Sequence, residues 1–192
     1  MSPKIVVIDG NIGAGKTAVL NRLKELGFTV FEEPMTIWQP LLELRQQEPK
    51  RWALAFQLCV ATHFIELEQK LKQINESVVF VERCTLAGWA FTRMAYERAE
   101  LTDVEFGILE RFFWTIPFSF DKLFILETSP QVCLHRIKER NRKGEEFLTL
   151  RDLKDLARNY NAVFQGKEKH IINGSKSTNE ITSEILSILM KN

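Results

Sequence analysis

The sequence Gly10-Asn11-Ile12-Gly13-Ala14-Gly15-Lys16-Thr17 fits the pattern G-x-x-x-x-G-K-T, a glycine-rich loop that wraps a phosphate with its backbone N–H groups. Glycine adopts the backbone conformations that such a loop needs, because it has no Cβ. In this pattern Lys16 reaches the β- and γ-phosphates, and the hydroxyl of Thr17 reaches Mg²⁺. These eight residues therefore predict a binding site for ATP and magnesium.

The segments on either side of the loop support this interpretation. Residues 4–8 form a short apolar run that is typical of a buried strand, and residues 17–26 carry apolar side chains at helical spacing. A strand, a glycine loop and a helix in succession are the context that the motif requires. The alternative is a chance glycine turn before a helix, which the four fixed positions and both flanking segments argue against.

The composition is that of a soluble globular protein, with 192 residues, 45% hydrophobic residues and 27% charged residues. We expect a single domain over residues 1–192. The net charge of +1 indicates no general attraction to nucleic acid or to a membrane. The first strand begins near residue 4, which leaves no room for a signal peptide. Three scattered cysteines (Cys59, Cys84 and Cys133) are expected to be reduced thiols, so we predict a cytoplasmic protein.

Strand-like and helix-like segments alternate along the rest of the chain. Further strands are expected at residues 28–31, 77–81, 123–126 and 171–172, and further helices at residues 51–71, 86–98, 104–114, 130–140, 149–164 and 179–190. This alternation predicts an α/β fold with a five-stranded parallel sheet covered by helices on both faces. A ligand site is expected at the carboxyl ends of the strands.

A carboxylate follows the second predicted strand. Pro34 biases Glu33 toward an extended conformation, so we expect its side chain to project from the end of the strand, beside the phosphate loop. There it could accept the proton of an attacking hydroxyl group. Trp38 could form a wall for a planar base. A solvated acidic turn is the alternative.

Gln57 is the single polar residue of an apolar helical stretch, residues 52–61. Its helical neighbours, Val60 among them, are apolar, so we expect it to face inward, where its amide needs hydrogen-bond partners. One amide supplies both an acceptor and donors, which suits the N3–H and O4 edge of thymine or the N3 and N4 edge of cytosine. The alternative is an amide paired with neighbouring backbone.

Glu82 and Arg83 follow the third predicted strand. Glu82 is placed to hold Mg²⁺ opposite Thr17, directly or through water. Arg83 could orient Glu33 and the reacting oxygen. A surface ion pair is the alternative.

Three arginines, Arg136, Arg140 and Arg142, run from a predicted helix into a charged loop. Planar guanidinium groups suit phosphate binding. A loop that closes over the triphosphate would exclude water, as a kinase requires. We therefore predict an arginine-rich lid at about residues 140–148, with a solvated basic helix end as the alternative.

Together these motifs resemble the deoxynucleoside kinase family of the non-zinc type, which includes thymidine, deoxycytidine and deoxyguanosine kinases. The matching pieces, in the order of the family, are the GNIGAGKT loop, Glu33-Pro34-x-x-x-Trp38, Arg51-Trp52…Phe56-Gln57, Glu82-Arg83 and His135-Arg136-x-x-x-Arg140-x-Arg142. The resemblance implies a P-loop kinase fold, the cofactors ATP and Mg²⁺, and phosphorylation of a deoxynucleoside 5′-OH. It also implies a possible homodimer, and the short chain is in keeping with a viral or bacterial member.

The resemblance further implies roles for single residues. Glu33 resembles the base that deprotonates the 5′-OH, and Arg83 the residue that orients the 5′-oxygen, with Lys16 on the phosphates. Glu145 is similar in position to the glutamate that bonds the sugar 3′-OH, and the tyrosine that often partners this hydroxyl maps to Gln46. The nucleoside pocket implied in this way also includes Trp38, Phe56, Gln57, Val60, Ala87, Gly88 and Phe91.

The same resemblance leads to an expected base preference. Deoxycytidine-type members carry an arginine and an aspartate where this chain has Phe64 and either Ala87 or Gly88. Small, uncharged residues there would leave room for the thymine methyl group, so thymidine is expected, with a deoxycytidine- or purine-preferring kinase as an alternative. A thymidylate or other nucleoside monophosphate kinase shares the loop and lid and is the nearest rival. A GTPase-type switch would need N-K-x-D and D-x-x-G, and neither string occurs.

Overall fold

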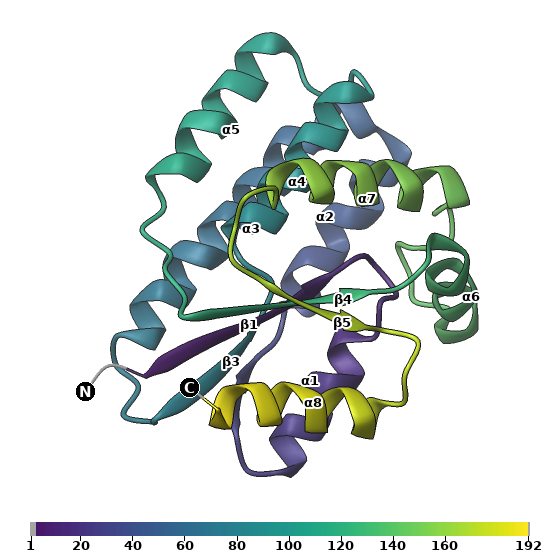
Figure 1. Ribbon diagram of the computed structural model, residues 1–192. Coiled ribbons are helices and arrows are strands. Elements are labelled where there is room, and N and C mark those ends of the chain that lie inside the picture. Colours follow the sequence, from purple (N-terminus) through teal and green to yellow (C-terminus); the bar gives the residue numbers. More distant parts are fainter. Residues whose placement is uncertain (1–2, 192) are drawn as a thin grey trace.

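The structure is a computed structural model that describes residues 3–191, and its centre is a parallel sheet with the strand order β2-β3-β1-β4-β5 (Figure 1). The strands are β1 (Lys4–Gly10), β2 (Thr29–Phe31), β3 (Val78–Glu82), β4 (Lys122–Glu127) and β5 (His170–Asn173). Every neighbouring pair runs parallel. The predicted five-stranded parallel sheet is confirmed, and each strand lies where the apolar runs placed it.

Helices connect the strands and cover both faces of the sheet. They are α1 (Lys16–Glu25), α2 (Met35–Gln47), α3 (Pro49–Leu71), α4 (Thr85–Glu97), α5 (Asp103–Thr115), α6 (Pro130–Arg140), α7 (Leu150–Val163) and α8 (Thr178–Met190). Sequence patterns did not predict α2. The helix contains Pro40, which lacks an N–H group, and only Trp38 among its residues is buried, so its apolar periodicity is weak.

Successive side chains of β1 point to opposite faces of the sheet, which explains why the strand is a continuous apolar run in the sequence. Val6 and Ile8 pack in one core cluster with residues of α1 and α8. Val7, between them, packs on the opposite face against residues of α4 and α7. Figure 1 shows the same layers, with α1 and α8 on one side of the sheet and α3, α4 and α7 on the other. Because both faces of the strand are buried, both need apolar side chains.

Polar side chains begin three of the helices in the same way. Thr102, Thr149 and Ser177 each accept a hydrogen bond from the backbone N–H three residues later, and the acidic side chain at that later position bonds back. These reciprocal caps satisfy N–H groups that the first helical turn leaves without partners. They fix where α5, α7 and α8 begin, and α7 is the helix that follows the predicted lid segment.

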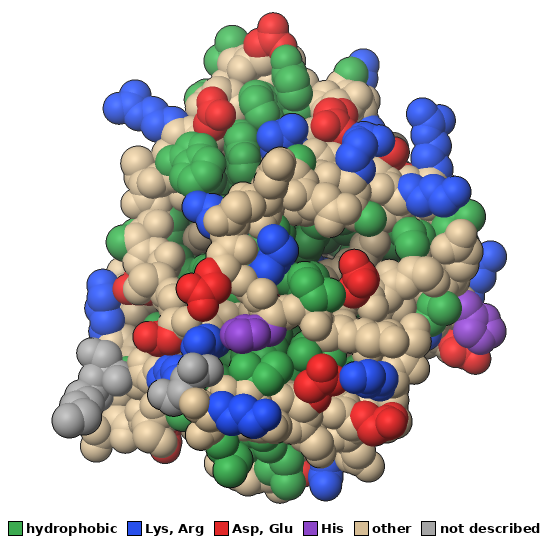
Figure 2. Space-filling view, viewed as in Figure 1, with side chains coloured by type: hydrophobic (Ala, Val, Ile, Leu, Met, Phe, Trp, Pro, Cys, Tyr) green, Lys and Arg blue, Asp and Glu red, His purple; other side chains and the backbone are tan. Residues whose placement is uncertain are grey.

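The outer surface carries both signs of charge. On the face in Figure 2, basic and acidic side chains are interspersed, in keeping with the net charge of +1. In residues 3–191, none of the helices has the combination of length and apolar character that crossing a bilayer requires.

The register of the sheet brings the predicted functional residues to one edge. Ile8 of β1 lies beside Glu82 of β3, and Phe31 at the end of β2 lies beside Val81. The glycine loop follows β1, Glu33 lies just past the end of β2, and Arg83 follows β3. The carboxyl ends of three neighbouring strands therefore meet at a single site.

Candidate active site

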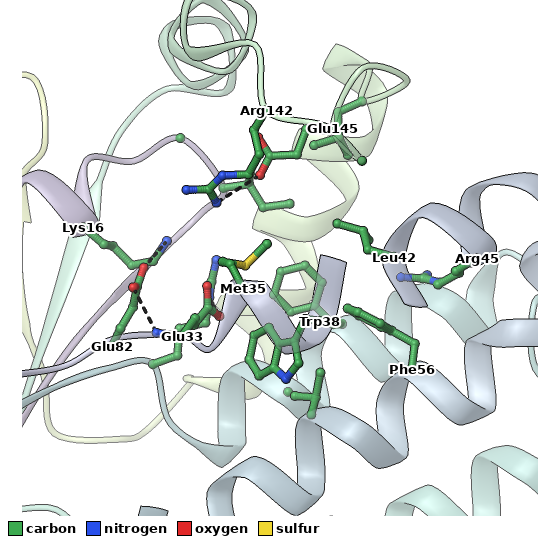
Figure 3. A pocket seen from close by; sticks show the side chains of 18 of the residues that line it. Lys16, Glu33, Met35, Trp38, Leu42, Arg45, Phe56, Glu82, Arg142 and Glu145 are labelled. Atoms are coloured by element: carbon green, nitrogen blue, oxygen red, sulfur yellow. Dashed lines mark hydrogen bonds and ion pairs between the residues drawn. The ribbon is translucent and has the colours of Figure 1, made fainter. Parts of the chain in front are cut away.

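A cavity of about 690 Å³ opens at this edge of the sheet. Figure 3 shows Lys16, Glu82 and Glu33 at one end of it, and Leu42, Phe56 and Arg45 at the other. Most of the predicted site residues line it, namely Ile12, Gly13, Gly15, Lys16, Thr17, Glu33, Trp38, Gln46, Phe56, Gln57, Val60, Glu82, Arg83, Gly88, Phe91, Arg136, Arg140, Arg142 and Glu145. The cavity thus joins a charged end, which suits a phosphate group, to an apolar end, which suits a planar base.

The glycine loop is shaped by close contact with α6. Gly13 has a φ of 77°, and a Cβ at this position would lie 2.6 Å from the backbone oxygen of Cys133. The loop is also held from outside, because Thr128 Oγ1 and Arg136 each donate a hydrogen bond of 3.1 Å to the backbone oxygen of Ala14. A side chain at position 13 would push the loop off α6, so the glycine is required by space as well as by conformation.

Four predicted residues lie outside the cavity wall. Gly10, Asn11 and Ala14 support the loop instead: Asn11 accepts from the Ile12 N–H at 2.8 Å and donates to the Leu153 backbone oxygen at 2.9 Å. Ala87 is a correction to the predicted pocket. It is fully buried in the core cluster of the sheet face covered by α4 and α7, because its position on α4 turns toward the sheet.

Lys16 lies at the charged end with its ammonium on the loop. Its Nζ donates to the backbone oxygens of Gly10 (3.2 Å) and Asn11 (3.0 Å) and lies 4.0 Å from Glu82 Oε1. Burial, followed by repulsion from Arg83, lowers the pKa of Lys16 to about 8. The group is therefore a cation whose charge is poorly compensated and which an anionic phosphate would stabilise.

Glu33 and Arg83 form an ion pair between the two ends of the cavity. The Arg83 Nε lies 2.6 Å from Glu33 Oε1, and both side chains are largely buried. Burial alone would lower the pKa of Arg83, but Glu33 and the other acidic groups around it raise that pKa above its usual value. Arg83 therefore stays charged, and Glu33 is held at the end of β2 as predicted.

Two residues that the sequence patterns missed complete the surroundings of Arg83. Its Nη1 also bonds the Gly10 backbone oxygen (2.9 Å), the Asp9 carboxylate (3.3 Å) and the Tyr160 hydroxyl. Asp9 is fully buried, and its Oδ1 accepts from the Tyr160 hydroxyl at 3.0 Å. Asp9 could have been recognised as a functional residue, because it is an acidic residue at the end of an otherwise apolar strand. Tyr160 lies 151 positions further along the chain, and no sequence pattern links it to the site.

Glu82 and Thr17 provide oxygen ligands of the kind that Mg²⁺ prefers, and both line the charged end of the cavity. Glu82 is buried, and burial followed by repulsion from Glu33 raises its pKa above the usual value. Glu82 Oε2 accepts one bond, from the Glu33 N–H at 3.4 Å. A buried carboxylate with so little compensation fits a nearby cation, so these two residues suit a magnesium ion that is held mainly by phosphates and water.

The predicted lid segment contacts α2. Glu145 is held by Arg140 through bonds of 2.7–2.9 Å, and Arg142 lies 3.6 Å away from it. Figure 3 shows Arg142 and Glu145 next to each other at the cavity margin. Gln46 of α2 donates to the Gly144 backbone oxygen. Glu145 thus neutralises two of the arginines that the resemblance assigns to ATP, whereas Arg136 donates to the backbone oxygens of Ala14 and Gly174.

The apolar end of the cavity is formed by α2, α3 and α4. Trp38 and Phe56 meet edge to face, with ring centroids 6.4 Å apart. Gln57 is buried as predicted, and its partner is a side chain rather than backbone: Thr92 Oγ1 lies 3.1 Å from Gln57 Oε1. The Phe91 ring packs under the Arg83 guanidinium, 5.1 Å from its centre. An aromatic, mostly apolar chamber with one amide in its wall is suited to a planar base.

The small residue Gly88 was expected to leave room for the thymine methyl group, but the space beside it is already occupied. A Cβ at Gly88 would lie 2.6 Å from Cε1 of Phe113, so the Phe113 ring already fills the direction of a side chain there. Gly88 is small because α4 and α5 approach each other closely. Two ion pairs that the patterns missed also line the cavity: Arg45 meets Glu100 at 2.5 Å, and Arg98 meets Asp152 at 2.6 Å.

The comparisons with known proteins agree with this geometry. The model of the deoxynucleoside kinase family matches residues 6–188. A protein of Frog virus 3, provisionally named a deoxynucleoside kinase, is 26% identical, with 98% of this chain and 95% of that protein covered. Deoxyguanosine kinase of Dictyostelium discoideum is 33% identical over 80% of this chain, which spans 56% of that protein's length.

Among solved structures, a deoxyadenosine kinase from M. mycoides with dCMP and dCDP bound has a TM-score of 0.87. The superposition covers 98% of this chain and 100% of that one at 20% identity, so it establishes the fold alone. The family match extends over nearly the whole chain and includes the glycine loop, Glu33, Gln57, the Glu82-Arg83 pair and the arginines of α6. This chain therefore belongs to the deoxynucleoside kinase family.

Proposed function

We propose that this protein transfers the γ-phosphoryl group of ATP to the 5′-OH of a pyrimidine deoxynucleoside, with thymidine as the preferred acceptor. The observation that carries the proposal is the position of Glu33, 2.6 Å from Arg83 and between the phosphate loop and the aromatic chamber of one cavity. A nucleoside with its base in the chamber would present its 5′-OH toward this carboxylate (Figure 3).

The proposed step has a simple balance of atoms. The 5′-oxygen forms a bond to the γ-phosphorus while the bond from that phosphorus to the β–γ bridging oxygen breaks, and ADP leaves. The proton of the 5′-OH passes to the Glu33 carboxylate. Because such transfers need little covalent help, the contribution of the protein is to position the groups and to stabilise charge, which Lys16 and Arg83 are placed to do.

The remaining polar groups have supporting roles in this proposal. Thr17 and Glu82 would hold Mg²⁺, which neutralises charge on the phosphates when it is bound. Arg136, Arg140 and Arg142 would bind the phosphates of ATP once Glu145 exchanges its arginine partners for the sugar 3′-OH. Residues 173–177 would border the adenine, since the backbone oxygen of Gly174 accepts from Arg136 at 3.1 Å.

Thymidine preference rests on the uncharged lining of the chamber. Phe64 and Gly88 line the cavity near Gln57 and carry no group that would pair with the exocyclic amine of cytosine. Burial of one methyl group contributes about 0.8 kcal/mol, so we expect a preference of a few-fold rather than an absolute one.

Phosphorylation of a panel of acceptors tests the proposal. With labelled ATP, we expect product from thymidine, deoxyuridine and deoxycytidine, and less from deoxyadenosine and deoxyguanosine. Thymidine monophosphate serves as the control acceptor. Phosphorylation of the monophosphate alone would support a nucleoside monophosphate kinase instead, and tight GTP binding with no acceptor at all would support a nucleotide switch.

The pKa of Lys16 predicts how ATP binding depends on pH. Since burial lowers this pKa to about 8, Lys16 is largely neutral in the free enzyme at pH 9. The triphosphate favours the charged form, so binding above pH 8 requires proton uptake, and affinity for ATP should fall roughly tenfold per pH unit there. Calorimetry between pH 7.5 and 9.5, in buffers of different ionisation enthalpy, would detect uptake approaching one proton. The Lys16→Met variant should bind weakly and without this dependence, and a flat profile for the wild type would contradict the assignment.

A further inference from the structure

The apolar end of the cavity contains a buried pair that joins Gln57 of α3 to Thr92 of α4. Both side chains are fully buried, and Thr92 lies behind Gln57, away from the cavity wall. Thr92 Oγ1 lies 3.1 Å from Gln57 Oε1 and 3.0 Å from the backbone oxygen of Gly88, one helical turn earlier. The Gln57 Nε2 has no hydrogen-bond partner in the described part of the chain. Thr92 therefore holds one end of the amide, and the other end is left for a molecule in the cavity.

The hydroxyl of Thr92 has one proton and two acceptors within reach. When the proton points to Gln57 Oε1, the amide offers its NH₂ group to the cavity. When the proton points to the Gly88 backbone oxygen, the Thr92 oxygen is free to accept, and the amide can turn over so that its NH₂ group donates to Thr92. The amide then offers its oxygen to the cavity. Oxygen and nitrogen of an amide are nearly equal in size, so both arrangements fit the same space.

At each of two positions on the base edge, thymine and cytosine require opposite ends of such an amide. At position 3, thymine has an N–H donor and cytosine has a bare nitrogen acceptor. At position 4, thymine has an oxygen acceptor and cytosine has an amine donor. A fixed amide matches one pattern and leaves a buried polar group unpaired against the other, which is costly. An amide that can turn over matches both.

We propose that Thr92 is a positioning residue, whose hydroxyl supports Gln57 in either orientation and so lets its amide face either thymidine or deoxycytidine. The inference rests on the proposed function, since it concerns the same pocket. It assigns the discrimination between pyrimidines to the shape of the chamber rather than to the amide.

Substitution of Thr92 tests this role through the kinetic constants of both nucleosides. For the wild type, we expect values of kcat/KM for thymidine and deoxycytidine within about tenfold of each other. Thr92→Val removes the hydroxyl at nearly constant volume and should raise KM for both nucleosides, roughly tenfold, with kcat and KM for ATP little changed. Thr92→Ser restores the hydroxyl and should restore both KM values. Thr92→Ala provides a second variant without the hydroxyl if valine impairs folding.

A matched control is available on α8. Thr182 is also buried, and its hydroxyl bonds the backbone oxygen of Thr178, one turn earlier, at 2.7 Å. Thr182→Val removes the same kind of bond away from the cavity and should leave both KM values unchanged. The inference is overturned if Thr92→Val affects one base only, which would show a fixed amide, or neither base, or if Thr182→Val has the same effect. It is also overturned if the wild type discriminates between the two pyrimidines by clearly more than this tenfold range. A wild-type protein that phosphorylates no nucleoside overturns the proposed function itself.

Discussion

Glu33→Gln is expected to lower kcat for nucleoside phosphorylation by about 10²–10⁴-fold, because the amide cannot accept the proton of the 5′-OH. The substitution keeps the size of the side chain, so KM for ATP should change little. Steady-state kinetics with thymidine as acceptor would measure both constants. The glutamine also loses the charge that faces Arg83, 2.6 Å away, so stability should be measured in parallel.

Glu32 provides the control for this substitution. It is adjacent in sequence and also lines the cavity, but it forms no ion pair within residues 3–191. Glu32→Gln makes the same change of charge and should leave kcat close to the wild-type value. Turnover near that of the wild type in Glu33→Gln would show that another group accepts the proton.

Arg83→Gln should have the largest effect on stability, with a loss of about 3–5 kcal/mol in the free energy of unfolding. Arg83 is 5% exposed and faces Asp9, which is 0% exposed, so its removal leaves a buried carboxylate without a counter-charge. Urea unfolding at pH 7 would measure the loss. Arg22→Gln is the control, because Arg22 pairs with Glu25 on the surface and such pairs contribute little.

A second substitution separates the structural role of Arg83 from its catalytic one. Adding Asp9→Asn to Arg83→Gln removes the unpaired carboxylate and should recover about 0.5–3 kcal/mol. Turnover should not recover, since Glu33 still lacks its partner. Burial raises the pKa of Asp9, so the folded single variant takes up a proton more readily than the unfolded chain. Its deficit should therefore shrink as the pH falls, and a deficit that is constant with pH would contradict this explanation.

Local patterns were sufficient for the sheet and for the phosphate loop. The loop has fixed spacing, and each strand is a short apolar run beside a turn, so nearby residues carry the signal. Helix α2 was missed because Pro40 argues against a helix at the level of the sequence and because most of its side chains lie at the cavity or the surface. Ala87 was assigned to the pocket through a resemblance that does not determine which way a position on α4 turns.

The contacts that complete the site could not be predicted because they join distant parts of the chain. Thr92 meets Gln57 across 35 positions, and Tyr160 meets Asp9 across 151. Each depends on how two helices, or a helix and a strand, pack against each other. A buried threonine or tyrosine has no spacing rule that distinguishes it from any other core residue.

The order of the strands also has a consequence for the growing chain. β1 is made first, yet its partner β3 begins 74 positions after Lys4, and its partner β4 begins at Lys122. The phosphate loop rests on Cys133 and Arg136, which are synthesised later still. Pairings between such distant segments form slowly, because a long loop must close before they contribute. During translation, the nucleotide site therefore remains incomplete at least until the segment from Cys133 to Glu145 has emerged from the ribosome.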